Sequence, residues 1–96
     1  MLIRNAVIDG YPGPVDLRLM HGAVQEIGTG LQKGLYESEL DLRGDELRPC
    51  PADVELPRKY RSARVGERHI LPGSHEPLTR WREGRMLGFV DQHTAD

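Results

Sequence analysis

The side chains that most often bind metals or act in catalysis are sparse in this chain of 96 residues. Its four histidines are His21, His69, His75 and His93. No two of them have the i, i+2 or i, i+4 spacing by which metal sites are usually recognised in a sequence. Each histidine is therefore expected to be a surface residue.

Two candidate nucleophiles also lack the neighbours that would activate them. Cys50 lies between two prolines, and a thiol becomes reactive only beside a base or a positive charge. His69 and His75 could converge with it in space, but the sequence gives no sign that they do. Ser74 precedes His75 without the Gly-x-Ser-x-Gly context of a hydrolase. We therefore expect no catalytic residue, and we interpret Cys50 as a small, partly buried apolar residue.

Charge is distributed unevenly along the chain. Residues 1–56 carry ten acids and five bases, whereas residues 57–96 carry five acids and eight bases. Most of the basic excess comes from Arg58, Lys59, Arg61, Arg64 and Arg68. A solvated loop is the ordinary interpretation. Binding of a nucleic acid or another anion is the alternative, although Tyr60 is the one aromatic residue among these bases. We expect no nucleic-acid partner.

The elements that would position these residues are short β-strands. Apolar and polar residues alternate over 15–20, and His21–Gly22 connects this strand to a second one over 23–27. Further strands are expected at 2–8, around Leu40 and Leu42, over 46–48, and in a hairpin of 78–82 and 85–90 that turns at Glu83–Gly84. Pro49 and Pro51 should end a strand at a sheet edge.

These strands predict an all-β fold, a small β-sandwich or flattened barrel of short, mostly antiparallel strands in one domain over 1–96. Residues 57–77 are expected to be mostly loop, with a possible short strand at 64–71, and residues 91–96 to be a loose tail. The expected core consists of Ile3, Val7, Val15, Leu17, Leu19, Val24, Ile27, Leu40, Leu42, Leu47, Trp81 and Leu87.

Composition indicates where such a domain would work. A lone cysteine cannot form an internal disulfide, and the first residues lack the basic and then apolar pattern of a secretory signal. No stretch is apolar enough to cross a membrane. We therefore expect a cytoplasmic protein without a membrane partner.

Two stretches carry a family resemblance, MLIRNAVIDG over 1–10 and VDLRLMHGAVQEIG over 15–28. They resemble the N-terminal β-segment of the metal-dependent amidohydrolases, such as dihydroorotases, hydantoinases and imidazolonepropionases. In that superfamily this segment is half of a small β-sandwich, the composite domain, and catalysis takes place in a separate (β/α)₈ barrel. A barrel needs at least about 200 residues. The resemblance therefore implies a composite domain without its barrel.

The same family enters its barrel through a Leu-x-Pro-Gly-hydrophobic-hydrophobic-Asp-x-His-x-His pattern, whose histidines bind zinc or another divalent metal. Laid over 47–57, the pattern matches Asp53 but places Glu55 and Pro57 where the two histidines belong. Proline has no side-chain ligand. The first overlay therefore implies no metal site.

A second overlay covers 88–95, GFVDQHTA, which keeps His93 and has Ala95 in place of the second histidine. His93 is thus a weak metal candidate, and because the rest of the ligand set is missing we expect no cofactor. The second half of the chain resembles instead the returning strands of the composite domain. Residues 52–56 would re-enter the sandwich, and the hairpin around 79–87 would pair beside the beginning of the chain.

The resemblance implies a stand-alone, non-catalytic relative of the composite domain that serves as a structural or interaction module. Loss of the barrel would expose a face of the domain, so we expect a homo-oligomer or a barrel-bearing partner. Trp81 and Phe89 are candidates for that face, and Arg58, Lys59 and Arg61 for a binding surface. The alternative is a fragment or subunit of a metal-dependent hydrolase that acts on non-peptide carbon–nitrogen bonds with a partner's barrel.

Overall fold

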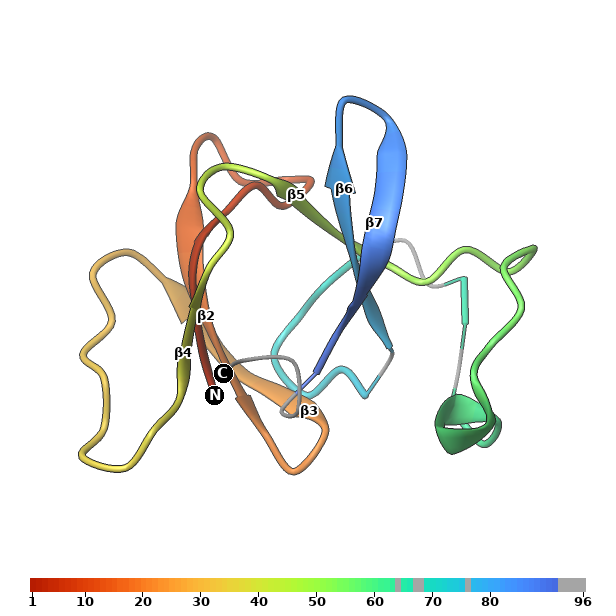
Figure 1. The fold of residues 1–96 in the computed structure, drawn as a ribbon. Helices are drawn as coiled ribbons and strands as arrows, with labels where there is room; N and C mark the ends of the chain where they lie inside the picture. Colours follow the sequence, from red (N-terminus) through yellow and green to blue (C-terminus); the bar gives the residue numbers. More distant parts are fainter. Residues whose placement is uncertain (64, 67–68, 76, 92–96) are drawn as a thin grey trace.

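The protein folds into two β-sheets that face each other (Figure 1). The computed structural model describes residues 1–63, 65–66, 69–75 and 77–91. One sheet has the strand order β3-β2-β1-β4 and the other has the order β5-β6-β7. The strands are β1 (Leu2–Ala6), β2 (Val15–Met20), β3 (Ala23–Gly28), β4 (Glu39–Asp41), β5 (Glu46–Pro49), β6 (Leu78–Arg82) and β7 (Arg85–Val90). The predicted all-β sandwich of short, mostly antiparallel strands is confirmed.

Both predicted hairpins are present, and their turns have the backbone conformation that two-residue connections require. His21 and Gly22 join β2 to β3 with φ angles of 53° and 77°. Glu83 and Gly84 join β6 to β7 with φ angles of 51° and 76°. Positive φ at both central positions matches the right-handed twist of the flanking strands, which explains why a glycine stands second in each turn.

The two sheets meet at the end of β1. We predicted a strand over 2–8, but β1 ends at Ala6 because the chain there leaves the first sheet. Val7 then forms a parallel bridge with Glu46. The amide of Val7 donates to the carbonyl of Asp45 over 3.0 Å, and the amide of Leu47 donates to Val7 over 2.9 Å. This seam aligns β5 with the end of β1.

The core lies between the sheets. Its fully or almost fully buried members are Met1, Ile3, Ala6, Ile8, Val15, Leu17, Leu19, Val24, Leu42, Leu47, Ile70, Leu78 and Val90. Three predicted core residues are placed elsewhere. Val7 is only partly buried and forms the bridge to Glu46 between the two sheets. Leu87 is 50% exposed because a bulge in β7 leaves it between the pairs Arg80–Gly88 and Trp81–Met86. Trp81 is only partly buried. It stands three positions after the core residue Leu78 in β6, so the alternation of the strand directs its side chain to the outer face of the sheet.

A buried charge also joins the second sheet to the turn that precedes β5. Asp45 accepts hydrogen bonds from Arg82 Nε and Nη2, each over 2.9 Å, and from Arg80 Nε over 2.6 Å. These two guanidinium groups, Arg82 first, lower the pKa of the Asp45 carboxyl from 3.8 to about 2. The cluster connects β5 and β6 through side chains as well as through the backbone ladder.

The second half of the chain departs from the composite-domain expectation in two ways. No strand forms at 52–56, because Ala52 and Asp53 lie in a turn closed by the bond from the Val54 amide to Pro51 over 3.1 Å. The hairpin of β6 and β7 pairs with β5, whereas β1 has β2 and β4 as its neighbours. It therefore does not lie beside the beginning of the chain in either sheet.

The segment 57–77 is mostly loop, as predicted, where the structure describes it. It contains one short 3₁₀ turn, η1 (Arg58–Tyr60), and its described residues between 65 and 71 belong to no strand, contrary to the possible strand at 64–71. In Figure 1 the green part of this segment projects from the side of β5 to β7 that faces away from the first sheet. Nowhere in the described ranges is there a helix with the length and apolar composition that a membrane span requires.

Candidate functional site

The histidines do not form a site among the described residues. His21, His69 and His75 are exposed, and His93 lies outside the described residues. Where the structure places side chains, no three of the His, Cys, Asp and Glu residues lie close enough together to hold a metal ion.

Cys50 is completely buried, more so than the sequence suggested. Its thiol donates a weak hydrogen bond to the carbonyl of Pro51 over 3.6 Å, and its backbone amide donates to Pro77 over 3.0 Å. Ser74 acts through its backbone, because its carbonyl accepts the Val24 amide over 2.9 Å and so covers the edge of β3. Both residues are therefore explained by packing and pairing.

Trp81 has its own partners on the outer face of the second sheet. The guanidinium carbon of Arg48 lies 4.5 Å from the centre of the indole ring, and Trp81 Nε1 donates to Thr79 Oγ1 over 2.8 Å. Thr79 is fully buried and donates in turn to the carbonyl of Arg48 over 2.9 Å. The stacking of Arg48 on Trp81 stabilises this face of the sheet. Because Arg48 covers one part of the indole ring, a smaller part of the ring is open to a partner.

Two residues of η1, Tyr60 and Lys59, contact Phe89 and Asp91 at the end of β7. The rings of Tyr60 and Phe89 stack with centroids 5.2 Å apart, and Lys59 Nζ lies 2.9 Å from Asp91 Oδ2. The Tyr60 hydroxyl also donates to Asp91. Burial, followed by the neighbouring carboxylate, raises the pKa of the Tyr60 phenol, and the hydrogen bond to Asp91 raises the pKa of Lys59. This contact attaches η1 to the end of β7.

The basic segment is thus divided in the structure. Lys59 is engaged by Asp91, whereas Arg58 and Arg61 are exposed on either side of it. Arg64 and Arg68 lie outside the described residues. An exposed arginine pair without an aromatic surface of its own fits the solvated loop that the composition favours.

The most distinctive surface lies between the strands predicted at 23–27 and around Leu40, in a stretch for which the sequence predicted no strand. Residues 29–38 link β3 to β4, and Leu35 and Tyr36 in this loop are 86% and 96% exposed. Met20, at the end of β2, is 45% exposed. We call Met20, Leu35 and Tyr36 the loop patch. They share a shallow hollow of about 420 Å³ lined by Met1, Arg18, Met20, Gln32, Gly34, Leu35, Tyr36 and Glu37.

Two arginines on the outer face of the first sheet hold this loop in place. Arg4 Nη1 donates to the carbonyl of Leu31 over 2.6 Å and pairs with Asp16 Oδ2 over 2.9 Å. Asp16 in turn accepts the amide of Leu31 over 3.1 Å. Arg18 donates to the carbonyl of Gln32 through Nη2. The first half of the loop is therefore fixed at Leu31 and Gln32 by charge-assisted hydrogen bonds.

Glu37 fixes the second half of the loop. Its carboxylate accepts Arg18 Nε over 2.9 Å and the amide of Gly34 over 2.9 Å. The Arg18 guanidinium, before any other group, lowers the pKa of Glu37 from 4.5 to about 2. Leu35 and Tyr36 lie between these two anchor points. Their exposure is therefore imposed by an ordered backbone.

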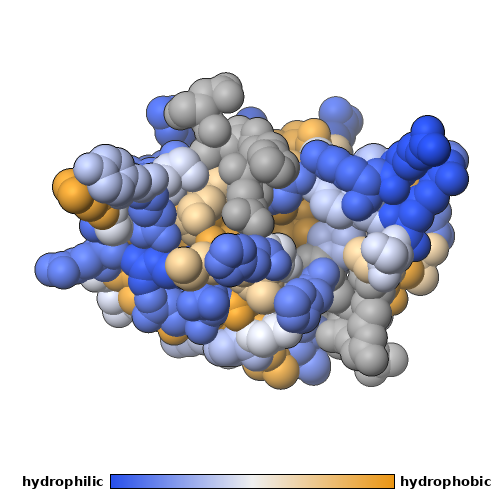
Figure 2. Space-filling model, turned by 90° about the horizontal axis from the view of Figure 1, so that it is seen from below, coloured by the Kyte–Doolittle hydropathy of each residue, from blue (hydrophilic) through white to orange (hydrophobic). Residues whose placement is uncertain are grey.

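In Figure 1 this loop is the yellow segment that projects at the left of the first sheet. Figure 2 views the molecule from below, and hydrophobic atoms project at the left margin of that view, over the same loop, beside hydrophilic groups. The surface offers apolar anchors surrounded by charge. It suits binding to another macromolecule better than it suits chemistry on a substrate.

No family model, curated protein or solved structure matches this chain. The amidohydrolase resemblance therefore depends on the residues quoted for it above and on nothing outside the sequence.

Proposed function

We propose that this chain is a non-catalytic interaction module that self-associates through the loop patch. The observation that supports this most directly is the exposure of Leu35 and Tyr36 on a loop held at both ends by Arg4, Arg18 and Glu37. Large apolar side chains that gather at the surface within a polar rim mark interaction sites. Tyrosine is also enriched among the residues that dominate binding energy.

The order of the loop matters for affinity. Immobilising a flexible loop on binding opposes association, and a loop that is already fixed avoids much of that cost. The contacts of Asp16 and Glu37 to the loop backbone provide this order before any partner arrives. We therefore assign the polar network a role in presenting the patch as well as in stabilising the sheet.

A second copy of the chain is the partner we favour. Most homo-oligomers are two-fold symmetric, and in such an interface the same patch of both subunits meets itself. The proposed relationship to the composite domain supports the same conclusion, because that domain in the amidohydrolases has a barrel as its neighbour.

The alternative is a subunit of a metal-dependent hydrolase whose partner supplies the barrel, and the resemblance of residues 1–28 is what favours it. Such a partner would contact this chain in place of a second copy. In either case we propose a cytoplasmic setting, where a single buried cysteine such as Cys50 stays reduced.

Multi-angle light scattering of the Leu35→Ser/Tyr36→Ser double variant tests this proposal. The wild type at tens of micromolar should have the mass of a dimer, and the double variant should have the mass of a monomer. Leu71→Ser is the matched control, because Leu71 is 55% exposed but lies outside the loop patch. A monomeric wild type, or a double variant that remains dimeric, would refute self-association through this patch.

A further inference from the structure

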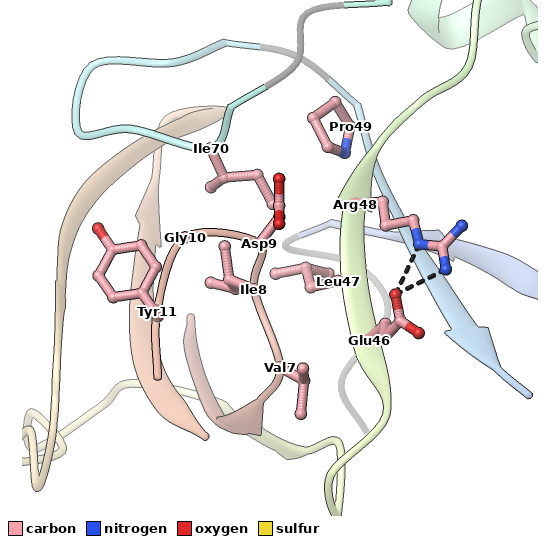
Figure 3. A pocket seen from close by; sticks show the side chains of 10 residues that line it. All are labelled: Val7, Ile8, Asp9, Gly10, Tyr11, Glu46, Leu47, Arg48, Pro49 and Ile70. Atoms are coloured by element: carbon pink, nitrogen blue, oxygen red, sulfur yellow. Dashed lines mark hydrogen bonds and ion pairs between the residues drawn. The ribbon is translucent and has the colours of Figure 1, made fainter. Parts of the chain in front are cut away.

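A cavity of about 530 Å³ opens where the two sheets part, just beyond the bridge between Val7 and Glu46 (Figure 3). This volume lies in the range of pockets that hold small molecules. Its lining comes from the segment that follows β1, from β5 and from one residue of the segment 57–77, namely Val7, Ile8, Asp9, Gly10, Tyr11, Glu46, Leu47, Arg48, Pro49 and Ile70.

The floor of the cavity is apolar. Ile8, Leu47 and Ile70 are almost completely buried, and Figure 3 shows their side chains converging from three different segments. Tyr11 packs against the same core from the loop side. A ligand that fills this space must therefore carry an apolar body.

The charged groups around the cavity are arranged asymmetrically. Asp9 is exposed at the cavity, beside Ile70 in Figure 3, and within the described residues its carboxylate has no hydrogen bond or ion pair. The guanidinium of Arg48 lies on the other side of β5, where it pairs with Glu46 over 2.7 Å and covers Trp81. The cavity thus has an available negative charge, and among the described residues that line it the one basic side chain, Arg48, is directed away from it.

The backbone of β5 adds acceptors and no further donor. The amide of Leu47 is used by Val7, so the backbone of Leu47 faces the side of β1. Two residues further on, the alternation of a strand directs the backbone of Pro49 to the same side. Proline has no N–H group. Beyond the seam, the β5 edge of the cavity therefore offers the carbonyl oxygens of Leu47 and Pro49.

From an apolar floor, an available carboxylate and an edge of carbonyl oxygens, we infer that this cavity binds a small primary amine with an aliphatic or aromatic body. Its ammonium group would donate to Asp9 and to the carbonyl of Leu47 or Pro49, and its body would lie on Ile8, Leu47 and Ile70. An anion of the same shape would be repelled by the Asp9 carboxylate and by the carbonyl oxygens of the β5 edge. This site is separate from the loop patch and does not depend on the proposed self-association.

Two-dimensional ¹H–¹⁵N NMR titration of the whole chain tests this inference with three probes of equal length, namely hexylamine at a pH where it is protonated, hexanoate and 1-hexanol. Hexylammonium should shift the amides of Ile8, Gly10, Leu47 and Ile70. It should bind more tightly than 1-hexanol, and hexanoate should leave these signals unchanged. Equal binding of all three probes, or shifts centred elsewhere, would overturn the inference.

The variant Asp9→Asn should weaken hexylammonium binding by up to about fivefold, the range of an exposed ion pair. Asp53→Asn is the control, since Asp53 is also exposed but does not line the cavity. The spectra themselves show whether each variant is folded. An unchanged affinity in Asp9→Asn would count against the carboxylate. Tighter binding of Nα-acetyl-lysinamide than of hexylamine would assign the cavity to a lysine side chain of a protein and contradict a small-molecule ligand.

Discussion

Glu37 is the residue on which the shape of the loop patch depends most directly. Its carboxylate contacts the side chain of Arg18 and the backbone of Gly34, and its side chain is only 13% exposed. Tyr36, its neighbour in the chain, is by contrast 96% exposed. A single carboxylate therefore determines how the adjacent aromatic ring is presented.

The variant Glu37→Gln should be less stable than the wild type by about 1 kcal/mol at pH 7, because the charged hydrogen bond to Arg18 is lost at a partly screened site. Urea unfolding followed by circular dichroism measures the difference. Glu55→Gln is the control, since Glu55 is exposed on the opposite half of the sequence. Glu37→Gln should also dimerise more weakly than the wild type, because the loop that carries the loop patch loses one of its anchors.

The same residue predicts a dependence on pH. The pKa of Glu37 in the folded protein, about 2, lies below its usual 4.5, so folding favours the ionised carboxylate. Its stabilisation is complete above about pH 4.5 and is lost as the pH falls towards 2. The stability difference between wild type and Glu37→Gln should therefore shrink across this window. The pKa of the Asp45 carboxyl is also lowered to about 2, but Asp45 is present in both proteins, so its contribution cancels in the difference. A difference that is constant with pH would contradict this assignment.

At the scale of elements, the Ile70 side chain packs the loop segment 57–77 against the sandwich. Ile70 is 3% exposed and belongs to the core, although it comes from a segment with little regular structure. Nearby, Gly73 donates its amide to the carbonyl of Val24 over 2.7 Å at the edge of β3. The loop is therefore a cover for both the core and a sheet edge.

The variant Ile70→Ala should lower the free energy of unfolding by about 2–4 kcal/mol, the usual range for removing a buried aliphatic side chain. Leu71→Ala should change stability by less than about 0.5 kcal/mol, because Leu71 is 55% exposed. Thermal or urea unfolding distinguishes the two. Equal effects of both substitutions would show that residues 69–75 do not pack as described.

What the sequence predicted, and what it did not, follows from the range of the interactions. Strands 15–20 and 23–28 are specified by alternation and by a two-residue turn, which are local properties, and they were predicted almost to the residue. Burial of Ile70 depends on contacts with residues far away in the sequence, which alternation does not report. The assignment of Leu87 to the core was wrong because a β-bulge at this position shifts the alternation of β7.

The candidate site was less predictable for the same reason. Trp81 and Phe89 were selected by residue type, but their surroundings, Arg48 and Tyr60, come from other parts of the chain. The loop patch was not predicted, because the contacts of Arg4 and Arg18 that hold its loop join residues far apart in the sequence. The available signal was the pair Leu35 and Tyr36 within a loop otherwise rich in polar residues and glycine, combined with Glu37 as an anchor.

At the scale of the whole molecule, the backbone bridge at Val7 and a shared apolar core join the two sheets. The ion pairs of Asp45 with Arg80 and Arg82 add support on the side of the second sheet. The loop patch lies on the first sheet's side of this structure, and the proposed amine cavity lies at the seam. A module of this kind carries its recognition surfaces on loops that a small rigid core positions.

Native mass spectrometry of the full chain, purified without chelators at micromolar concentration, tests the central claim most directly because it gives oligomeric mass and metal content together. The account of a non-catalytic, self-associating module predicts a dimer without bound metal. A monomer would contradict self-association. Stoichiometric zinc or another transition metal would contradict the non-catalytic assignment and would favour the hydrolase alternative.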